Sequence, residues 1–359
     1  GKLGRYDVVE GFARKASEVA DSSAARSALI ICLCECASYL TFGGRYAAAD
    51  ALIERLRRDA PDLAELSPSE AALIHQLFAI RASYAGDGGA CLAAFRAALA
   101  SFEQAGDQRN ACAVRSNLGF VLAELGDFKG AENALRTALT WAGGMGLLDL
   151  ETVALQNLGR VLAYLGRLEE ARSIEQRAAD VFQKLGDPRM EGASLRYIAE
   201  IALLAGDLEV AEQKARAAAS ALDVAPPMKA TATAVLARVL LRRGFVAEGL
   251  WAAREAFATL EALGALEEGE SLVRLVHAEA LEAAGERAEL WRAIASARDR
   301  LIERASKITD AAWREQFLTA VPDNARTLSM WAQASARRES RDFGPRSAGR
   351  GGASPALHA

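Results

Sequence analysis

The sequence predicts an all-α protein built as a solenoid of helix-turn-helix repeats. Three observations predict it. A glycine-centred motif returns about every 40 residues, a small residue stands seven positions before most of these glycines, and a second glycine or a proline follows about twenty positions after several of them. Together these features divide most of the chain into helical hairpins of one design.

The recurring glycines mark the turn inside each hairpin. Motifs such as LGDF at Leu125 and LGRL at Leu165 share one glycine, which can reverse the chain between two helices because it lacks the Cβ that strains a left-handed conformation. Successive glycines are 38 to 42 residues apart, and this spacing sets the length of the repeat. The anchoring glycines are Gly4, Gly44, Gly86, Gly126, Gly166, Gly206, Gly244 and Gly285.

Small side chains keep fixed distances from the anchoring glycine. Positions seven residues before it and twelve residues after it fall on one face of each helix, and a small residue beside a large apolar one lets two helices cross closely. The first position holds Ala37, Ala79, Gly119, Gly159, Ala199, Ala237 and Ala278, and the second holds Ala16, Leu56, Ala98, Ala138, Ala178, Ala218, Ala256 and Ala297. A second stop signal then ends the hairpin at Gly106, Gly146, Gly186, Pro226 and Gly264.

This order of small, large and turn residues resembles the tetratricopeptide repeat. The resemblance is clearest in Asn117-Leu118-Gly119 to Ala138 and in Asn157-Leu158-Gly159 to Ala178, and it covers roughly residues 1 to 305. It implies a right-handed superhelix in which the first helix of each pair lines a concave surface. The repeat is longer than the usual 34 residues, a form similar to repeats of bacterial signalling ATPases, transcription activators and Ser/Thr kinases.

The domain organisation follows from where the pattern begins and ends. We expect one solenoid over residues 1–335, with a truncated first unit because Gly4 lacks the helix that should precede it. Its remaining helix should run from Tyr6 to about Ala20. Residues 308–335 should form a helical cap, and residues 336–359, rich in Arg, Ser, Gly and Pro, should be a disordered tail.

Composition narrows the class of protein. The net charge is -4 and the 43 basic residues are spread along the chain, so no nucleic-acid partner is expected. No apolar run reaches the roughly 18 to 20 residues of a membrane helix, and no secretory leader opens the chain. Five cysteines at irregular spacing do not suggest a disulfide framework. These features predict a soluble, cytoplasmic protein.

Nothing in the sequence predicts catalysis, a cofactor or a metal. Cys32, Cys34 and Cys36 fall on one helix, where the middle residue points about 200° away from the other two, so we interpret them as packing residues. The acidic pairs Glu169-Glu170 and Glu267-Glu268 lie near turns and helix starts, and we interpret them as solvated surface.

The candidate binding site lies on the first helices of two adjacent units. Asn117 and Asn157 occupy the same column 40 residues apart, so they should be neighbours in space. The resemblance places them on the concave surface, where an amide can bind the backbone of an extended peptide. Alternatively, both Asn side chains are merely exposed or bond within the scaffold. Nearby residues that could add specificity are Gln156, Arg160, Tyr164, Arg196 and Glu200.

The sequence therefore predicts a non-catalytic protein-interaction scaffold whose concave groove binds a peptide, a partner protein or an upstream domain of the same polypeptide. The alternative is the regulatory or sensory C-terminal region of a larger bacterial Ser/Thr kinase or signalling ATPase. A third hypothesis, a structural spacer, predicts no ligand at all.

Overall fold

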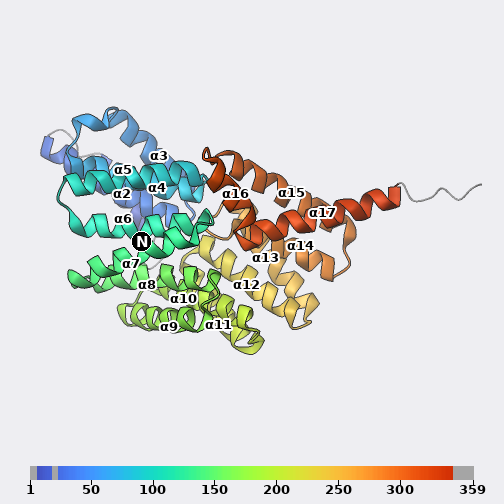
Figure 1. Ribbon diagram of the computed structural model, residues 1–359. Helices are drawn as coiled ribbons and strands as arrows, with labels where there is room; N and C mark the ends of the chain where they lie inside the picture. The colour runs from blue at the N-terminus through green and yellow to red at the C-terminus, as the bar shows by residue number, and fades with distance from the viewer. Residues whose placement is uncertain (1–5, 18–22, 343–359) are drawn as a thin grey trace, which may run out of the picture.

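The computed structural model describes residues 6–17 and 23–342. Within these residues all regular structure is helical, and seven consecutive helix pairs follow a single first helix (Figure 1). The all-α solenoid predicted from the glycine spacing is confirmed. No helix in this part of the chain is long and apolar enough to span a membrane.

The pairs share one design, in which two helices are joined by a short turn at an anchoring glycine. The first helix is α1 (Tyr6–Ser17), and Gly4 lies outside the described residues. The pairs are α2 (Ser23–Phe42) with α3 (Tyr46–Asp59), α4 (Pro68–Tyr84) with α5 (Gly88–Gln104), α6 (Gln108–Glu124) with α7 (Phe128–Gly144), α8 (Leu148–Tyr164) with α9 (Leu168–Leu185), α10 (Pro188–Ala205) with α11 (Leu208–Ala221), α12 (Pro226–Arg242) with α13 (Val246–Leu263), and α14 (Glu270–Ala283) with α15 (Arg287–Ser306). Helices α16 (Ala311–Thr319) and α17 (Pro322–Asp342) close the array, and the short 3-10 helices η1 (Leu63–Glu65) and η2 (Leu222–Val224) precede α4 and α12.

A Gly-Asp pair explains both the turn and the start of the next helix at several positions. The described anchoring glycines have φ between +69° and +86°, a region that favours glycine. The aspartate that follows then caps the next helix, as at Asp127, whose Oδ1 accepts a hydrogen bond from the backbone nitrogen of Gly130 at 2.9 Å. Such a cap contributes about 1 kcal/mol to helix stability. The same arrangement recurs at Asp87, Asp107, Asp187 and Asp207.

The small column lets the two helices of a pair cross closely. A Cβ added to Gly119 on α6 would lie 2.5 Å from Cγ of Leu135 on α7. In the next pair, a Cβ on Gly159 would lie 2.5 Å from Oε1 of Glu175. The alanines that fill this column elsewhere are fully buried, namely Ala37, Ala79, Ala199, Ala237 and Ala278.

The array curves until its two ends meet, a feature that the sequence did not predict. Figure 1 shows α16 beside α4 and α5. Leu301 and Phe317 from the C-terminal helices share one hydrophobic cluster with Val121 and Leu125 of the third pair. In a simple solenoid each repeat touches only its neighbours. Here a Cβ added to Gly86 in the second pair would lie 2.9 Å from Nε of Arg304 on α15, and one added to Gly126 in the third pair would lie 2.8 Å from the carbonyl oxygen of Gln316 on α16. The early pairs therefore contact the C-terminal helices, and the superhelix closes around a central space.

The C-terminal helix is longer than expected. The sequence predicts that the cap ends at residue 335, but α17 continues to Asp342. Two contacts stabilise the added turns: an ion pair of 2.9 Å between Arg337 and Glu282, and the guanidinium of Arg338 above the ring of Trp291. The rest of the expected tail, residues 343–359, and the expected last turn of α1 at residues 18–20 lie outside the described residues.

The cysteine cluster lies on α2, as the sequence indicates. Cys34 and Cys36 are buried, and Cys34 belongs to the hydrophobic cluster formed by the first two pairs. The Sγ atoms of Cys32 and Cys36 are 4.0 Å apart on the same face. Burial raises the pKa of both Cys34 and Cys36 to about 12, so these two thiols are protonated packing residues at neutral pH.

Candidate functional site

Polar side chains from several distant helices converge at the centre of the closed superhelix. They surround a cavity of about 40 Å³, which has room for a few water molecules and none for a polypeptide. The cavity wall includes Glu124, Arg160, Tyr164, Arg196, Glu200 and Glu268, together with parts of α14 to α17.

One carboxylate, that of Glu268, occupies the middle of this cluster. Its Oε1 lies 2.9 Å from Nε of Arg160 on α8, and its Oε2 lies 2.7 Å from Nη2 of Arg196 on α10. The hydroxyl of Tyr197 donates a hydrogen bond to the same Oε2 at 2.8 Å. The side chains of Arg160 and Arg196 are only 7% and 3% exposed, so both charges are removed from water and paired with carboxylates.

Each arginine also has a second acidic partner. Arg160 pairs with Glu124 at the end of α6, and Nη1 of Arg196 lies 2.6 Å from Oε1 of Glu200. Burial alone would raise the pKa of Glu268, but the two guanidiniums and the bonds from Arg196 and Tyr197 outweigh burial and hold the pKa below its ordinary value. At Glu200 burial dominates and raises the pKa, although Arg196 opposes it.

Glu268 belongs to the link between α13 and α14, residues 264–269, which we call the inserted segment. Its backbone is held by other parts of the chain. Tyr46 on α3 donates to the carbonyl of Ala265 at 3.0 Å, and Thr231 on α12 donates to the carbonyl of Glu268 at 3.0 Å. Leu266 is fully buried in the hydrophobic cluster of the later pairs. The inserted segment is thus held both by the adjacent pairs and by side chains of the more distant helices α3, α8 and α10.

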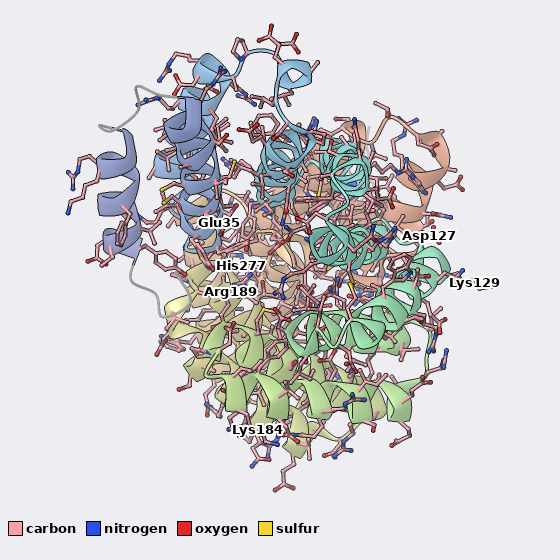
Figure 2. The ribbon with its side chains drawn as sticks, turned by 90° about the vertical axis from the view of Figure 1, so that its left-hand side faces the viewer. Glu35, Asp127, Lys129, Lys184, Arg189 and His277 are labelled. Carbon is pink, nitrogen blue, oxygen red and sulfur yellow. The ribbon has the colours of Figure 1, made fainter. Side chains whose placement is uncertain are left out.

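The neighbouring Glu267 sits in a different environment. Burial raises its pKa to about 6, although the charge of Arg189 and the hydroxyl of Tyr84 oppose the rise. Figure 2 labels Arg189 where the blue N-terminal helices meet the green helices, and its guanidinium lies 4.4 Å from the ring centroid of Phe42 on α2. Glu267 is therefore enclosed at the junction of early and middle pairs.

Comparison with known proteins agrees with this architecture. A tetratricopeptide-repeat family profile matches residues 152–185, which cover most of α8 and α9. Among solved structures, a Rap protein complexed with competence and sporulation factor superimposes with a TM-score of 0.61 at 12% identity, over 94% of this chain and 98% of that one. The chain is a solenoid of tetratricopeptide-like repeats.

Two further structures share the solenoid fold. The Rap conjugation gene regulator of plasmid pLS20 in complex with the Phr* peptide has a TM-score of 0.52 at 14% identity, over 95% of this chain and 98% of that one. The APC/C hetero-tetramer Cut9-Hcn1 has a TM-score of 0.53 at 10% identity, over 85% of this chain and 55% of that one. No curated protein matches the sequence.

The solenoid brings four of the seven predicted site residues together at the central cavity: Arg160, Tyr164, Arg196 and Glu200. Tyr164 is half-buried and stacks on Phe128 with ring centroids 4.8 Å apart. These side chains face the interior of the superhelix, but in this structure they meet the inserted segment and neighbouring helices of the same chain.

The three amide residues lie outside this cavity. Gln156 is buried and donates to the Met190 carbonyl at 2.8 Å and to the Ser194 hydroxyl at 2.7 Å, joining α8 to α10. Asn157 donates to the hydroxyl of Ser116 at 3.3 Å, so it reaches the residue beside Asn117 rather than Asn117 itself. Asn117 is partly exposed on α6. Asn157 thus bonds within the scaffold, as the alternative stated for the two Asn residues has it, and Gln156, predicted as a residue that adds specificity, also bonds within the scaffold.

The interpretation of Glu267-Glu268 as solvated surface is wrong. The side chain of Glu268 is only 14% exposed and pairs with Arg160 and Arg196, and Glu267 is half-buried near Arg189 and Tyr84, because the inserted segment turns inward. The signal in the sequence was the spacing of two glycines, Gly264 and Gly269, around a short acidic stretch. A Cβ on Gly269, whose φ is +79°, would lie 2.4 Å from Cγ2 of Thr231, so this glycine permits the close approach.

Proposed function

We propose that this solenoid is a non-catalytic protein-interaction module that binds an extended peptide or a segment of a partner protein in its interior. We call the binding region the channel, meaning the interior of the superhelix around Arg160, Tyr164, Arg196 and Glu200, which the inserted segment occupies in this structure. The observation that carries the proposal is that the channel already holds a non-helical stretch of polypeptide. The inserted segment is bound through a backbone carbonyl by Thr231 and through a side-chain carboxylate by Arg160 and Arg196. These are the contacts with which a groove recognises an extended peptide.

The shared fold supports the proposal. The two Rap structures bear names that include a bound peptide or factor, and this chain covers nearly the full length of both. In the proposed site, Arg160 and Arg196 bind an acidic group, and Tyr164 and Glu200 form the wall of the channel. Gln156 and Asn157 set the spacing of α6, α8 and α10 through their bonds within the scaffold. Asn117, which is partly exposed, contacts the peptide backbone at the edge of the channel.

The proposal is tested by selecting peptides from a displayed random library on the full chain and measuring their affinity by fluorescence anisotropy. Arg196 binds Glu200 and Glu268 through two different nitrogens. Arg196→Lys, measured in the Glu268→Gln background so that the inserted segment does not compete through the same arginine, should weaken the selected peptides by roughly tenfold, because Lys cannot replace both nitrogens. Asn117→Ala should weaken them by a few-fold, about the value of one hydrogen bond.

The matched control is Arg136→Lys, because Arg136 is a half-exposed arginine of α7 that pairs with Glu132 and Glu170 outside the channel. In the same background, its affinity should equal that of Glu268→Gln alone. The proposal fails if no peptide is enriched, or if Arg196→Lys binds the selected peptides as tightly as Arg136→Lys does while both variants keep the helix content of the unaltered chain.

The connection to an upstream kinase or ATPase domain stays a prediction, as does the cytoplasmic location. Sequence upstream of Gly1 that contains a nucleotide-binding loop or a kinase catalytic loop would support the connection.

A further inference from the structure

We infer that the inserted segment, residues 264–269, is an internal ligand of the channel, and that the peptide accepted in its place is acidic, with a Glu or Asp side chain between Arg160 and Arg196. This inference rests on the proposed function. It adds that the ligand is an acidic peptide, and that this peptide is excluded while the inserted segment occupies the channel.

The length of the inserted segment is the first reason. The links α5–α6, α7–α8 and α9–α10 contain two or three residues, which suffice to connect one pair to the next. The link between α13 and α14 contains six, none of them helical, whereas the other long links, residues 60–67 and 222–225, are built around the 3-10 helices η1 and η2. The additional residues are those that reach the centre of the superhelix, so the extra length serves the contact with the channel rather than the turn.

The second reason is the way in which the segment is held. Its contacts come from α3, α8 and α10, which are distant in sequence, and from α12 of the pair that precedes it, and they follow the pattern of a bound peptide. Tyr46 and Thr231 bind two main-chain carbonyls, Leu266 fills an apolar pocket, and Glu268 fills a charged one. Because the segment is held by the same kinds of contact that hold a bound peptide, a peptide of the same chemistry can replace it.

The third reason is the charge of the pocket that Glu268 fills. Nε of Arg160, Nη2 of Arg196 and the hydroxyl of Tyr197 converge on one carboxylate within 2.9 Å. A neutral side chain could not satisfy two buried guanidiniums in this geometry, and a basic one would be repelled. The pocket therefore selects an acidic side chain.

The fourth reason is that Glu268 can leave the pocket without leaving a buried arginine unpaired. With Glu268 in place, the two arginines face three carboxylates, those of Glu124, Glu200 and Glu268. When Glu268 leaves, Arg160 keeps Glu124 and Arg196 keeps Glu200, so each positive charge still has a partner. Burial raises the pKa of the neighbouring Glu267 to about 6. Keeping its ionised carboxylate buried at neutral pH therefore costs free energy while the inserted segment occupies the channel.

The size of the cavity makes the two ligands mutually exclusive. About 40 Å³ of free space cannot admit a peptide chain while the inserted segment is seated. Binding of an acidic peptide thus requires the segment to swing out, which would free Tyr46 and Thr231 and break the contact between the link and the early pairs.

The test uses a fluorescein-labelled peptide with the sequence of residues 261–272, EALGALEEGESL, and a second peptide in which the residue corresponding to Glu268 is Gln. Both are titrated against the full chain and its Glu268→Gln variant. The acidic peptide should bind the variant at least tenfold more tightly than it binds the unaltered chain, because the internal competitor has lost its charge. On the same variant, the Gln peptide should bind roughly tenfold more weakly than the acidic peptide.

The matched control is Glu261→Gln, which alters a glutamate that is 55% exposed on α13, outside the inserted segment. Its affinity for the acidic peptide should equal that of the unaltered chain. Combining Glu268→Gln with Arg196→Lys should abolish the gain, since the receiving pocket is then altered.

Hydrogen exchange on the unaltered chain decides the matter if Glu268→Gln does not fold. Saturating acidic peptide should accelerate exchange of the amides of residues 265–269, and the Gln peptide should not. Unchanged exchange there, or a folded Glu268→Gln variant that binds the acidic peptide no better than the unaltered chain, would show that the segment is a fixed structural strut.

The outcomes separate this inference from the proposed function. If library-selected peptides bind the channel and respond to Arg196→Lys but are not acidic, or are unaffected by Glu268→Gln, the proposed function stands and the internal ligand does not. If no peptide binds any form of the chain, both are overturned.

Discussion

Phe317→Ala should destabilise helices that are almost two hundred residues away in sequence. Phe317 lies on α16, is 5% exposed and packs in the cluster that also contains Val121 and Leu125 of the third pair. Truncating a buried phenylalanine to alanine costs about 3–5 kcal/mol, because the lost apolar contact leaves a cavity. The ring also lies 5.4 Å from the guanidinium of Arg304, a contact that the variant removes.

The assay is native-state hydrogen exchange read by mass spectrometry. Since about 1.4 kcal/mol corresponds to a factor of ten, the loss should accelerate exchange by roughly two to three and a half powers of ten for amides that exchange by opening of this contact. The acceleration should appear in α4 to α6 as well as in α15 and α16, because both ends of the array share the damaged cluster.

Phe182→Ala on α9 is the control, since Phe182 is 3% exposed but lies in the middle of the array. Its effect should be largest in α8 to α10. Accelerated exchange confined to α15–α17 in Phe317→Ala would refute the closed architecture, because a simple solenoid transmits damage only to adjacent repeats.

Three further changes test other parts of the structure. Gly119→Leu should lower the free energy of unfolding by about 1–3 kcal/mol or more in a thermal melt, because its side chain would collide with Leu135; an unchanged melt would contradict the close crossing. Tyr46→Phe removes the bond to the Ala265 carbonyl and should cost about 1 kcal/mol in urea denaturation, with no loss if that bond is dispensable. Glu267 has a folded-state pKa of about 6, above the ordinary 4.5, so its contribution is greatest below pH 4.5 and about 2 kcal/mol is lost as the pH rises through 6. Urea denaturation of Glu267→Gln between pH 4.5 and 7 should therefore show a flatter dependence on pH than the unaltered chain, and parallel curves would argue against a buried Glu267.

The hairpins could be predicted from the sequence because their determinants are local. A glycine at positive φ lies at each described turn, an aspartate cap follows it at several of them, and small residues such as Gly119 recur at fixed distances from the turn. These features repeat in register, so each unit supports the interpretation of the others. The number of pairs and the position of each turn followed directly.

The centre of the molecule could not be predicted in the same way. Arg196 and Glu268 are 72 residues apart, and their pairing depends on how far the whole array curves. Small differences in the angle between successive pairs add up along the superhelix, and no single repeat encodes the sum. For the same reason, the inward faces of α8 and α10 were recognised as a candidate site, while the segment that fills them was not.

The tether on both sides of Glu268 has a consequence for any molecule that enters the channel. A carboxylate held on a short link faces its arginines at an effective concentration on the order of millimolar. A free competitor must therefore exceed a threshold before it gains occupancy, and lengthening or shortening the stretch from Gly264 to Gly269 would move that threshold without altering the recognition pocket.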